Sequence, residues 1–141
     1  MSSFTYNKAK ESIGKGEIAW GTDTFYVSLH TSTHTPDQDT DQYFSDVDNE
    51  ISTSGTYTSG GVALASLTTS VDNTTNRAEF DAADLSLTGF TGVFRYAIVR
   101  KYNATPSISR LVCLIDFGSD VTVTNNTYTL TWNADGIFQL S

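Results

Sequence analysis

The segment from residue 34 to residue 50, HTPDQDTDQYFSDVDNE, holds six of the sixteen carboxylates of the chain and has the composition of a metal-binding loop. Asp37, Asp39 and Asp41 alternate as the first ligands of an EF-hand calcium loop do. That loop also requires glycine at its sixth position and glutamate at its twelfth, which here are Gln42 and Asp48. The template fails, so we predict a solvated acidic connection. A looser calcium site on the three aspartates stays open as the alternative.

Two histidines, His30 and His34, are four residues apart. On a helix this spacing places both imidazoles on one face, where they can share a zinc ion. The residues before His34 have the pattern of a strand, and in an extended chain the two histidines lie about 13 Å apart. The sequence therefore does not predict a zinc pair.

The other reactive side chains do not form a catalytic pattern. Serine is abundant, but no Gly-x-Ser-x-Gly nucleophile elbow occurs. Cys113 lies in the most apolar segment and is expected to be a small core side chain. Asp116 lies in the same segment, so its carboxylate needs a partner. We expect Arg95 or Arg100, with an acid–base role for Asp116 as the alternative. The sequence predicts a protein that is not an enzyme and has no metal or cofactor.

The charge and composition argue against several classes of protein. The net charge is −8, and the eight basic residues form no stripe, which argues against a nucleic-acid ligand. The chain has no apolar run long enough to span a membrane, and its first residues, MSSFTYNKAK, lack the apolar core of a signal peptide. We therefore expect synthesis in the cytoplasm and no membrane partner. With one cysteine, no disulfide can form within the chain.

Only one segment, Tyr6 to Gly14, has the pattern of a helix. Asn7 is a candidate N-cap, and Gly14 is placed to end the helix. Two turns of helix are too short to be stable alone, so packing must hold them.

From residue 24 onward the apolar residues follow the two-residue period of strands. The strands are predicted at residues 24–30, 62–67, 77–82, 93–102, 110–117, 128–132 and 136–140. Turn signals separate them at residues 71–73, 88–92, 103–106, 118–120, 125–126 and 133–136. In the first strand, Phe25, Val27 and Leu29 are expected to share one face. Segment 110–117 is apolar on both faces and predicts a central strand. The pattern predicts a mainly β fold, a single-domain antiparallel β-sandwich with one short N-terminal helix.

The remaining features predict a protein that works by contact. Seven tyrosines, eight phenylalanines and two tryptophans are many for a domain of 141 residues. Some should be exposed or at an interface, and the candidates are Tyr26, Tyr43, Tyr57 and Tyr102. Residues 1–20 are expected to form an N-terminal arm and helix. Residues 34–61 form a long acidic loop region rich in Thr, Ser and Gly, and such loops usually bind something.

Five segments resemble a family of small virion proteins of tailed bacteriophages. These are FTYNKAKESI (4–13), YTSGGVAL (57–64), DNTTNRAEFDA (72–82), IDFG (115–118) and LTWNADGIF (130–138). The resemblance runs nearly end to end, and no catalytic residue comes with it. It implies a structural component of the particle, and we favour a capsid decoration (cement) protein that binds and stabilises the assembled phage head.

The resemblance also implies partners and a location. A decoration protein binds the major capsid protein on the capsid surface of the virion, after synthesis in the host cytoplasm, and a homotrimer is favoured. We expect the contact elements to be Ser2–Lys15, as a mobile arm that orders on docking, and Asp37–Glu50. The contact residues are predicted to be Phe4, Tyr6, Lys8, Tyr43 and Phe44. The alternative is a neck, tail or short-fibre component with a receptor- or glycan-binding surface.

Overall fold

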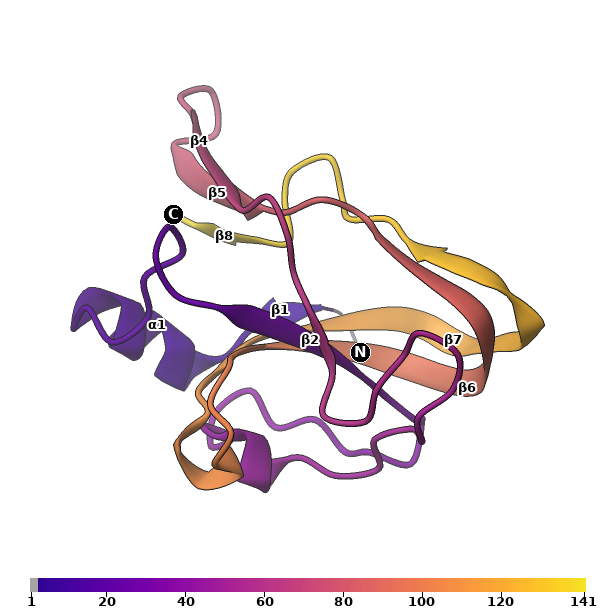
Figure 1. Ribbon diagram of the computed structural model, residues 1–141. Coiled ribbons are helices and arrows are strands. Elements are labelled where there is room, and N and C mark those ends of the chain that lie inside the picture. Colours follow the sequence, from indigo (N-terminus) through magenta and orange to yellow (C-terminus); the bar gives the residue numbers. More distant parts are fainter. Residues whose placement is uncertain (1–2) are drawn as a thin grey trace.

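Two antiparallel sheets face each other in the computed structural model, which describes residues 3–141 (Figure 1). Strands make up 47% of the structure and helix 10%, in one small domain consistent with a β-sandwich. The five-stranded sheet has the order β1-β7-β6-β2-β3 and the three-stranded sheet the order β4-β5-β8. The strands are β1 (Phe4–Thr5), β2 (Phe25–His30), β3 (Val62–Ala63), β4 (Thr68–Asp72), β5 (Arg77–Asp81), β6 (Leu85–Lys101), β7 (Leu111–Leu130) and β8 (Phe138–Leu140). The predicted fold class is confirmed.

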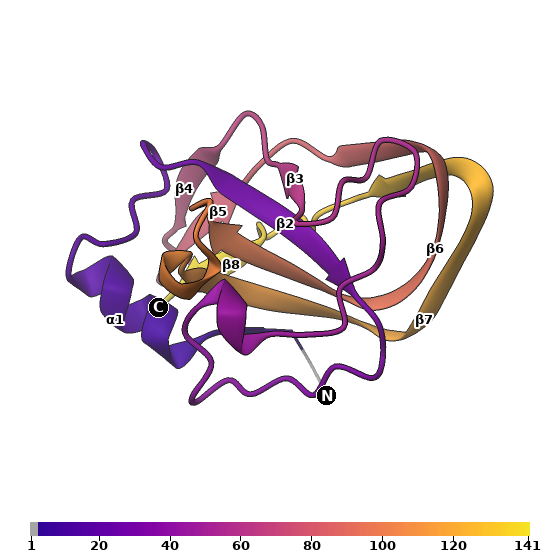
Figure 2. The ribbon, with the colours of Figure 1, turned by 60° about the horizontal axis from the view of Figure 1, so that its bottom comes forward.

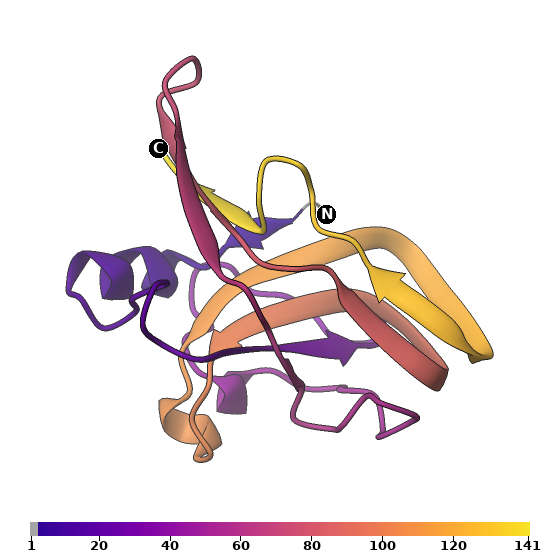
Figure 3. The same cartoon turned by 45° about the horizontal axis from the view of Figure 1, so that its top comes forward.

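The long hairpin of β6 and β7 connects the two layers. Both strands run through the larger sheet and then curl over, so that the start of β6 and the end of β7 lie in the other layer (Figures 1 and 3). Their register shifts at four places along this course. β-Bulges bend strands in this way and increase their twist. One pair of strands thereby closes the end of the sandwich.

The turns predicted inside this hairpin were wrong. The sequence predicted turns at residues 88–92, 118–120 and 125–126, but β6 and β7 continue through all three segments. Gly89, Gly118 and Asn125 do have positive φ angles, of 57°, 84° and 41°. Positive φ serves a bulge as well as a turn, so the residue types alone do not distinguish the two.

The central part of the larger sheet is buried on both faces. The first four residues of β7, Leu111 to Leu114, are fully buried, which confirms the core position of Cys113. The predicted strand at 110–117 is an inner strand, between β1 and β6, but its residues 115–117 are only half-buried. In β2, the expected core residues Phe25, Val27 and Leu29 are buried, but Ser28 and His30 on the opposite face are buried as well. The segment from residue 31 to residue 61 covers that face in Figure 1.

The helix α1 (Asn7–Gly14) confirms the predicted helix almost to the residue. Its N-cap is Tyr6, which makes no side-chain cap, so the prediction of Asn7 as N-cap was wrong by one position. β1 immediately precedes it and pairs with β7 through Phe4 and Leu114. From residue 4 onward the N-terminal stretch is therefore part of the folded domain, which contradicts the expected mobile arm. Residues 1 and 2 lie outside the described part of the chain.

β4 was not predicted. Its sequence, TTSVD, shows no alternation because four of its five residues are exposed and the strand forms an edge of the smaller sheet. The β4–β5 hairpin projects from the body of the molecule (Figure 3). Within residues 3–141, no helix is long and apolar enough to cross a membrane.

Candidate functional site

Hydrogen bonds join the two segments that the sequence predicts as contact elements. The backbone N–H of Asn7 donates to the carbonyl of Gln38 at 3.1 Å, and the Asn7 side-chain amide donates to Asp39 Oδ1 at 2.8 Å. The side-chain amide of Gln38 donates to the carbonyl of Thr5 at 3.0 Å. The acidic segment therefore crosses the first turn of α1, and the two elements form one surface.

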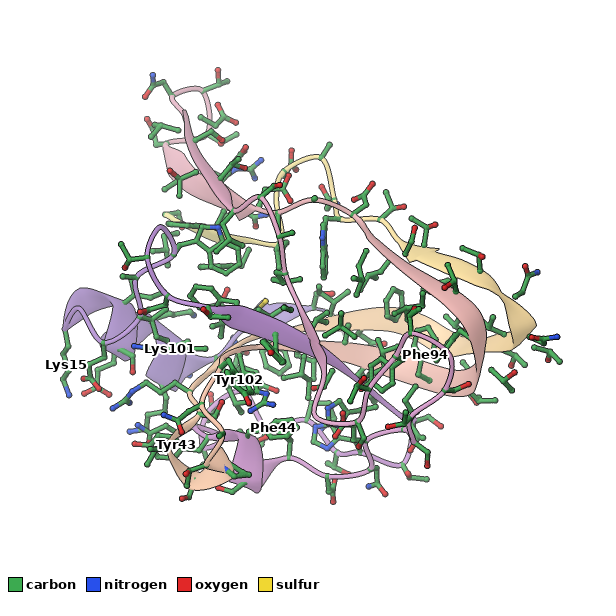
Figure 4. All side chains as sticks on the ribbon, in the orientation of Figure 1. Lys15, Tyr43, Phe44, Phe94, Lys101 and Tyr102 are labelled. Carbon is green, nitrogen blue, oxygen red and sulfur yellow. The ribbon has the colours of Figure 1, made fainter. Side chains whose placement is uncertain are left out.

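The turn between β6 and β7 extends this surface. The 3₁₀ helices η1 (Phe44–Asp46) and η2 (Pro106–Ile108) lie side by side near α1 (Figures 1 and 2). The backbone N–H of Phe44 donates to the Ser109 carbonyl at 2.8 Å, and the Arg110 guanidinium carbon lies 5.4 Å from the Tyr43 ring centroid. The guanidinium carbon of Arg100 lies 3.8 Å from the Phe44 ring centroid and 5.3 Å from that of Tyr102, and both rings are labelled in Figure 4.

Arg110 links this turn to the end of α1. Its guanidinium forms an ion pair with Glu17 and donates to Ser12 Oγ at 3.2 Å. We call the combined surface the helix–loop face, made of residues 7–17, 37–50 and 102–110. It presents exposed charges on α1 beside half-buried aromatic rings.

Of the five predicted contact residues, Lys8, Tyr43 and Phe44 belong to this face, and Phe4 and Tyr6 do not. Lys8 is exposed and forms a 3.9 Å ion pair with Glu11, while Phe4, Tyr43 and Phe44 are half-buried. Tyr6 is completely buried, so its prediction as a contact residue was wrong. The reason is β1, whose pairing with β7 turns the Tyr6 ring into the core.

Of the four tyrosines predicted to be exposed or at an interface, only Tyr57 is fully buried, and its prediction was wrong. The Tyr57 hydroxyl donates to Glu50 Oε1 at 2.7 Å and accepts the Leu29 backbone N–H at 2.9 Å. Tyr102 is 39% exposed, which confirms its prediction. The remaining two, Tyr26 and Tyr43, are half-buried.

The aspartates of the acidic segment accept backbone N–H groups. Asp37 Oδ1 accepts from Asp39 and Thr40, each at 3.0 Å, and the hydrogen bonds from Thr40 hold the pKa of Asp37 below its ordinary value. Asp46 Oδ2 accepts from Tyr43 at 2.8 Å at the start of η1. In residues 3–141 no group of three His, Cys, Asp or Glu side chains is arranged to hold a metal ion. These contacts are those of turns and caps.

The expected separation of the two histidines was wrong. A turn in which the His34 N–H bonds the Thr31 carbonyl folds the chain back, and the ring centroids of His30 and His34 are 5.6 Å apart. Asp48 contacts both, because its carbonyl meets His30 Nδ1 and its Oδ1 meets His34 Nδ1, each at 2.7 Å. Burial lowers the pKa of His30 to about 4, so this imidazole is neutral at physiological pH.

Arg95 is the partner of Asp116, and it is one of the two arginines that the sequence predicted for this role. Its Nε and Nη2 donate to the two carboxylate oxygens at 2.9 and 3.2 Å. Burial pushes the pKa of Asp116 upward, but these bonds and one from the Gly118 N–H keep it below its ordinary value. The carboxylate is thus held in an ion pair.

Arg100, the other expected partner, instead lies under a hollow that the sequence did not reveal. The hollow measures about 390 Å³ and is lined by Tyr26, Phe44, Thr58, Ser59, Gly60, Gly61, Arg100, Tyr102, Asn103, Ala104 and Pro106. Its walls come from β2, η1, the 58–61 turn and the β6–β7 turn. No local motif could have found it, because segments far apart in the sequence build it.

Comparisons of the chain with protein-family models, with curated proteins and with solved structures found no match.

Proposed function

We propose that this chain is a non-enzymatic structural protein of a tailed-bacteriophage virion, a capsid decoration protein that binds and stabilises the assembled head. The observation that carries the proposal is the helix–loop face. Two segments that resemble no catalytic motif are held together by hydrogen bonds from Asn7 and Gln38 into one rigid surface. A preformed surface with aromatic anchors and charged edges suits docking on a lattice that is already assembled.

The partner that we propose for this face is the major capsid protein, and a homotrimer of the decoration protein is the favoured assembly. Tyr43 and Phe44 supply half-buried aromatic area, and the exposed charges of α1 lie on the same face. Aromatic residues near the centre of a contact, with charges at its rim, are typical of protein interfaces.

The test is to locate and count the protein on purified virus particles, by gold-labelled antibody imaging and by quantifying its band in a gel of the same sample. Label over the whole head, in copy numbers that rival the major capsid protein, is the expected result. Label confined to the neck or tail at a dozen or so copies would contradict the decoration role and favour a connector or a receptor-binding part. Particles without label would overturn the virion assignment.

A further inference from the structure

Arg100 is a buried cation without a carboxylate partner in the part of the chain that the structure describes. Only 3% of the residue is exposed, and no carboxylate oxygen of residues 3–141 lies within 4.0 Å of its nitrogens. The other three arginines, Arg77, Arg95 and Arg110, each form an ion pair. A buried charge without an opposite charge is costly, so the local environment of Arg100 favours an added anion.

The guanidinium of Arg100 is held in place but not saturated. Its Nη1 donates to Ser109 Oγ at 2.8 Å and to the Asn103 carbonyl at 3.4 Å, and its Nη2 donates to the Gly60 carbonyl. The buried Nε has no hydrogen-bond partner in the described residues. An arginine carries five N–H donors in a planar fork that matches a carboxylate. Two of the five, the buried Nε N–H and one Nη2 N–H, therefore make no hydrogen bond in the described residues.

The aromatic rings around Arg100 provide a second kind of contact. Its guanidinium carbon lies 3.8 Å from the Phe44 ring centroid, and the rings of Tyr26 and Tyr102 stack with centroids 4.0 Å apart. Tyr102 leaves 39% of its surface exposed at the edge of the hollow. Thr58, Ser59 and Asn103 complete a lining in which, among the described residues, Arg100 is the only charged side chain. The Ser59 hydroxyl donates to Glu50 at 3.4 Å, and the Asn103 amide oxygen accepts from the Thr105 N–H at 2.9 Å.

From this arrangement we infer that the hollow is a binding site for a carboxylate-bearing saccharide, such as a hexuronic or sialic acid. The carboxylate accepts a hydrogen bond from Arg100 Nη2, where the Gly60 carbonyl now lies, and the sugar ring packs against the exposed part of Tyr102. The hydroxyl and amide groups of Thr58, Ser59 and Asn103 meet the sugar hydroxyls. A hollow of about 390 Å³ is within the size range of small-molecule sites. This inference does not rest on the proposed place of the protein in a virion.

Arg100 gives the hollow a positive charge, although the chain as a whole has a net charge of −8. Glu50 acts electrostatically on Arg100, but its Oε1 already accepts the Gly60 N–H at 2.6 Å and the Tyr57 hydroxyl at 2.7 Å. Since the Arg100 Nε is closed to solvent, a bound carboxylate must displace the Gly60 carbonyl or shift the 58–61 turn. The amide signals of Gly60 and Gly61 should therefore respond to binding.

The test is an NMR titration of the full-length, ¹⁵N-labelled protein with two matched sugars, methyl β-D-glucuronoside and methyl β-D-glucoside. They differ only in a carboxylate in place of a hydroxymethyl group. The glucuronoside is expected to bind at least about tenfold more tightly, because charge-assisted hydrogen bonds contribute more than neutral ones. Its shifts should map to residues 58–61 and 102–104. 3′-Sialyllactose against lactose repeats the comparison with a second acidic sugar.

Two variants connect the binding to the hollow. Tyr102→Ala removes an exposed ring and should weaken glucuronoside binding at least about tenfold, while Ile108→Ala, which is 56% exposed and outside the hollow, should leave it unchanged. Arg100→Lys keeps the charge but removes the planar fork, and should reduce the preference for the acidic sugar, with a thermal melt to verify folding.

Equal affinity for both sugars would overturn the carboxylate recognition. No binding at millimolar concentrations, or shifts elsewhere on the protein, would overturn the site. Tighter binding of acetyl-Gly-Glu-amide than of either acidic sugar would also overturn the saccharide assignment, since it would show that the hollow takes a peptide carboxylate.

Discussion

The side-chain amide of Asn7 donates a hydrogen bond of 2.8 Å to the Oδ1 of Asp39 and so joins α1 to the acidic segment. Each residue also takes part in the local structure of its own segment, since the Asn7 Oδ1 accepts from Lys10 and the Asp39 N–H donates to Asp37. The helix–loop face is therefore ordered before any partner binds. Docking then requires little conformational entropy loss from this surface.

Substitutions on the helix–loop face should weaken binding to phage heads without unfolding the protein. Tyr43→Ala removes a half-buried aromatic ring, and Lys8→Glu reverses an exposed charge on α1. We expect the pair to reduce binding to undecorated heads at least about tenfold, because aromatic anchors carry much of the energy of an interface. Co-sedimentation of the purified variant with heads measures the effect.

The matched control is Val71→Ser on β4, which is 69% exposed and lies on the projecting hairpin. It should bind heads like the unaltered protein. Loss of binding by Val71→Ser, together with normal binding by the double variant, would show that the contact lies on the β4–β5 hairpin and not on the helix–loop face. Deleting residues 1–14 is not a suitable test, because that deletion would remove β1 and the buried Tyr6 from the core.

The fold class followed from the sequence because the strand periods are local. β2, β5 and the first half of β7 alternate or are continuously apolar, and the structure places them as strands. The prediction failed where strands do not face the core or where glycine serves two purposes. β4 is exposed on both faces, and Gly89 and Gly118 have the positive φ of turns while lying in bulged strands.

The candidate site was predictable only in its segments. Acidic composition marked residues 37–50, and the helix pattern marked α1. The two segments are joined by hydrogen bonds of Asn7 and Gln38, and no sequence pattern at these residues predicts a long-range contact. The environment of Arg100 likewise depends on a turn at Gly60 and on stacking between Tyr26 and Tyr102, and these meet only in the folded chain.

Calcium and a chelator should leave the melting temperature unchanged. The Asp37 carboxylate already accepts two backbone N–H groups, and Asp46 accepts those of Gln42 and Tyr43. A ligand that binds only the folded state raises the melting temperature by an amount that grows with the logarithm of the ligand concentration divided by Kd. Differential scanning fluorimetry with millimolar calcium or EDTA measures this. A rise of several degrees with calcium, lost in Asp39→Asn, would restore the looser metal site.

Removing the buried hydroxyl of Tyr6 and removing that of Tyr57 should change the free energy of unfolding in opposite directions. The Tyr6 hydroxyl is buried with no hydrogen-bond partner in residues 3–141, whereas the Tyr57 hydroxyl donates to Glu50 and accepts from Leu29. An unsatisfied buried hydroxyl is destabilising, so Tyr6→Phe should raise the free energy of unfolding by about 1 kcal/mol. Tyr57→Phe leaves the Leu29 N–H without its partner and should lower the same quantity by about 2 kcal/mol.

Urea denaturation of the two variants and the unaltered protein, at one pH and temperature, tests the pair. The two substitutions remove the same atom, so the comparison separates hydrogen bonding from the loss of volume. Destabilisation by Tyr6→Phe of the same size as that by Tyr57→Phe would contradict the view that the Tyr6 hydroxyl is unsatisfied.

The stability of the fold should fall as the pH drops from about 6.5 to 4, and His30 should account for part of the loss. Burial lowers the pKa of His30 from 6.5 to about 4 in the folded protein. Above pH 6.5 the imidazole is neutral in both states and contributes no pH dependence. Between 6.5 and 4 the unfolded chain binds the proton more readily, so acid favours unfolding, by roughly 3 kcal/mol at the lower end.

Besides burial, three neighbouring groups shift the pKa of His30. The Asp48 carbonyl, which accepts from Nδ1, raises it, and His34 and Arg100 lower it. His30→Gln keeps a polar side chain that does not titrate. Urea denaturation of this variant and of the unaltered protein, from pH 7.5 to pH 4, isolates the His30 contribution from that of the carboxylates. The variant should lose less stability over this range. Parallel pH profiles, or an NMR pKa of His30 near 6.5, would contradict the prediction, because either result requires a ring that water reaches.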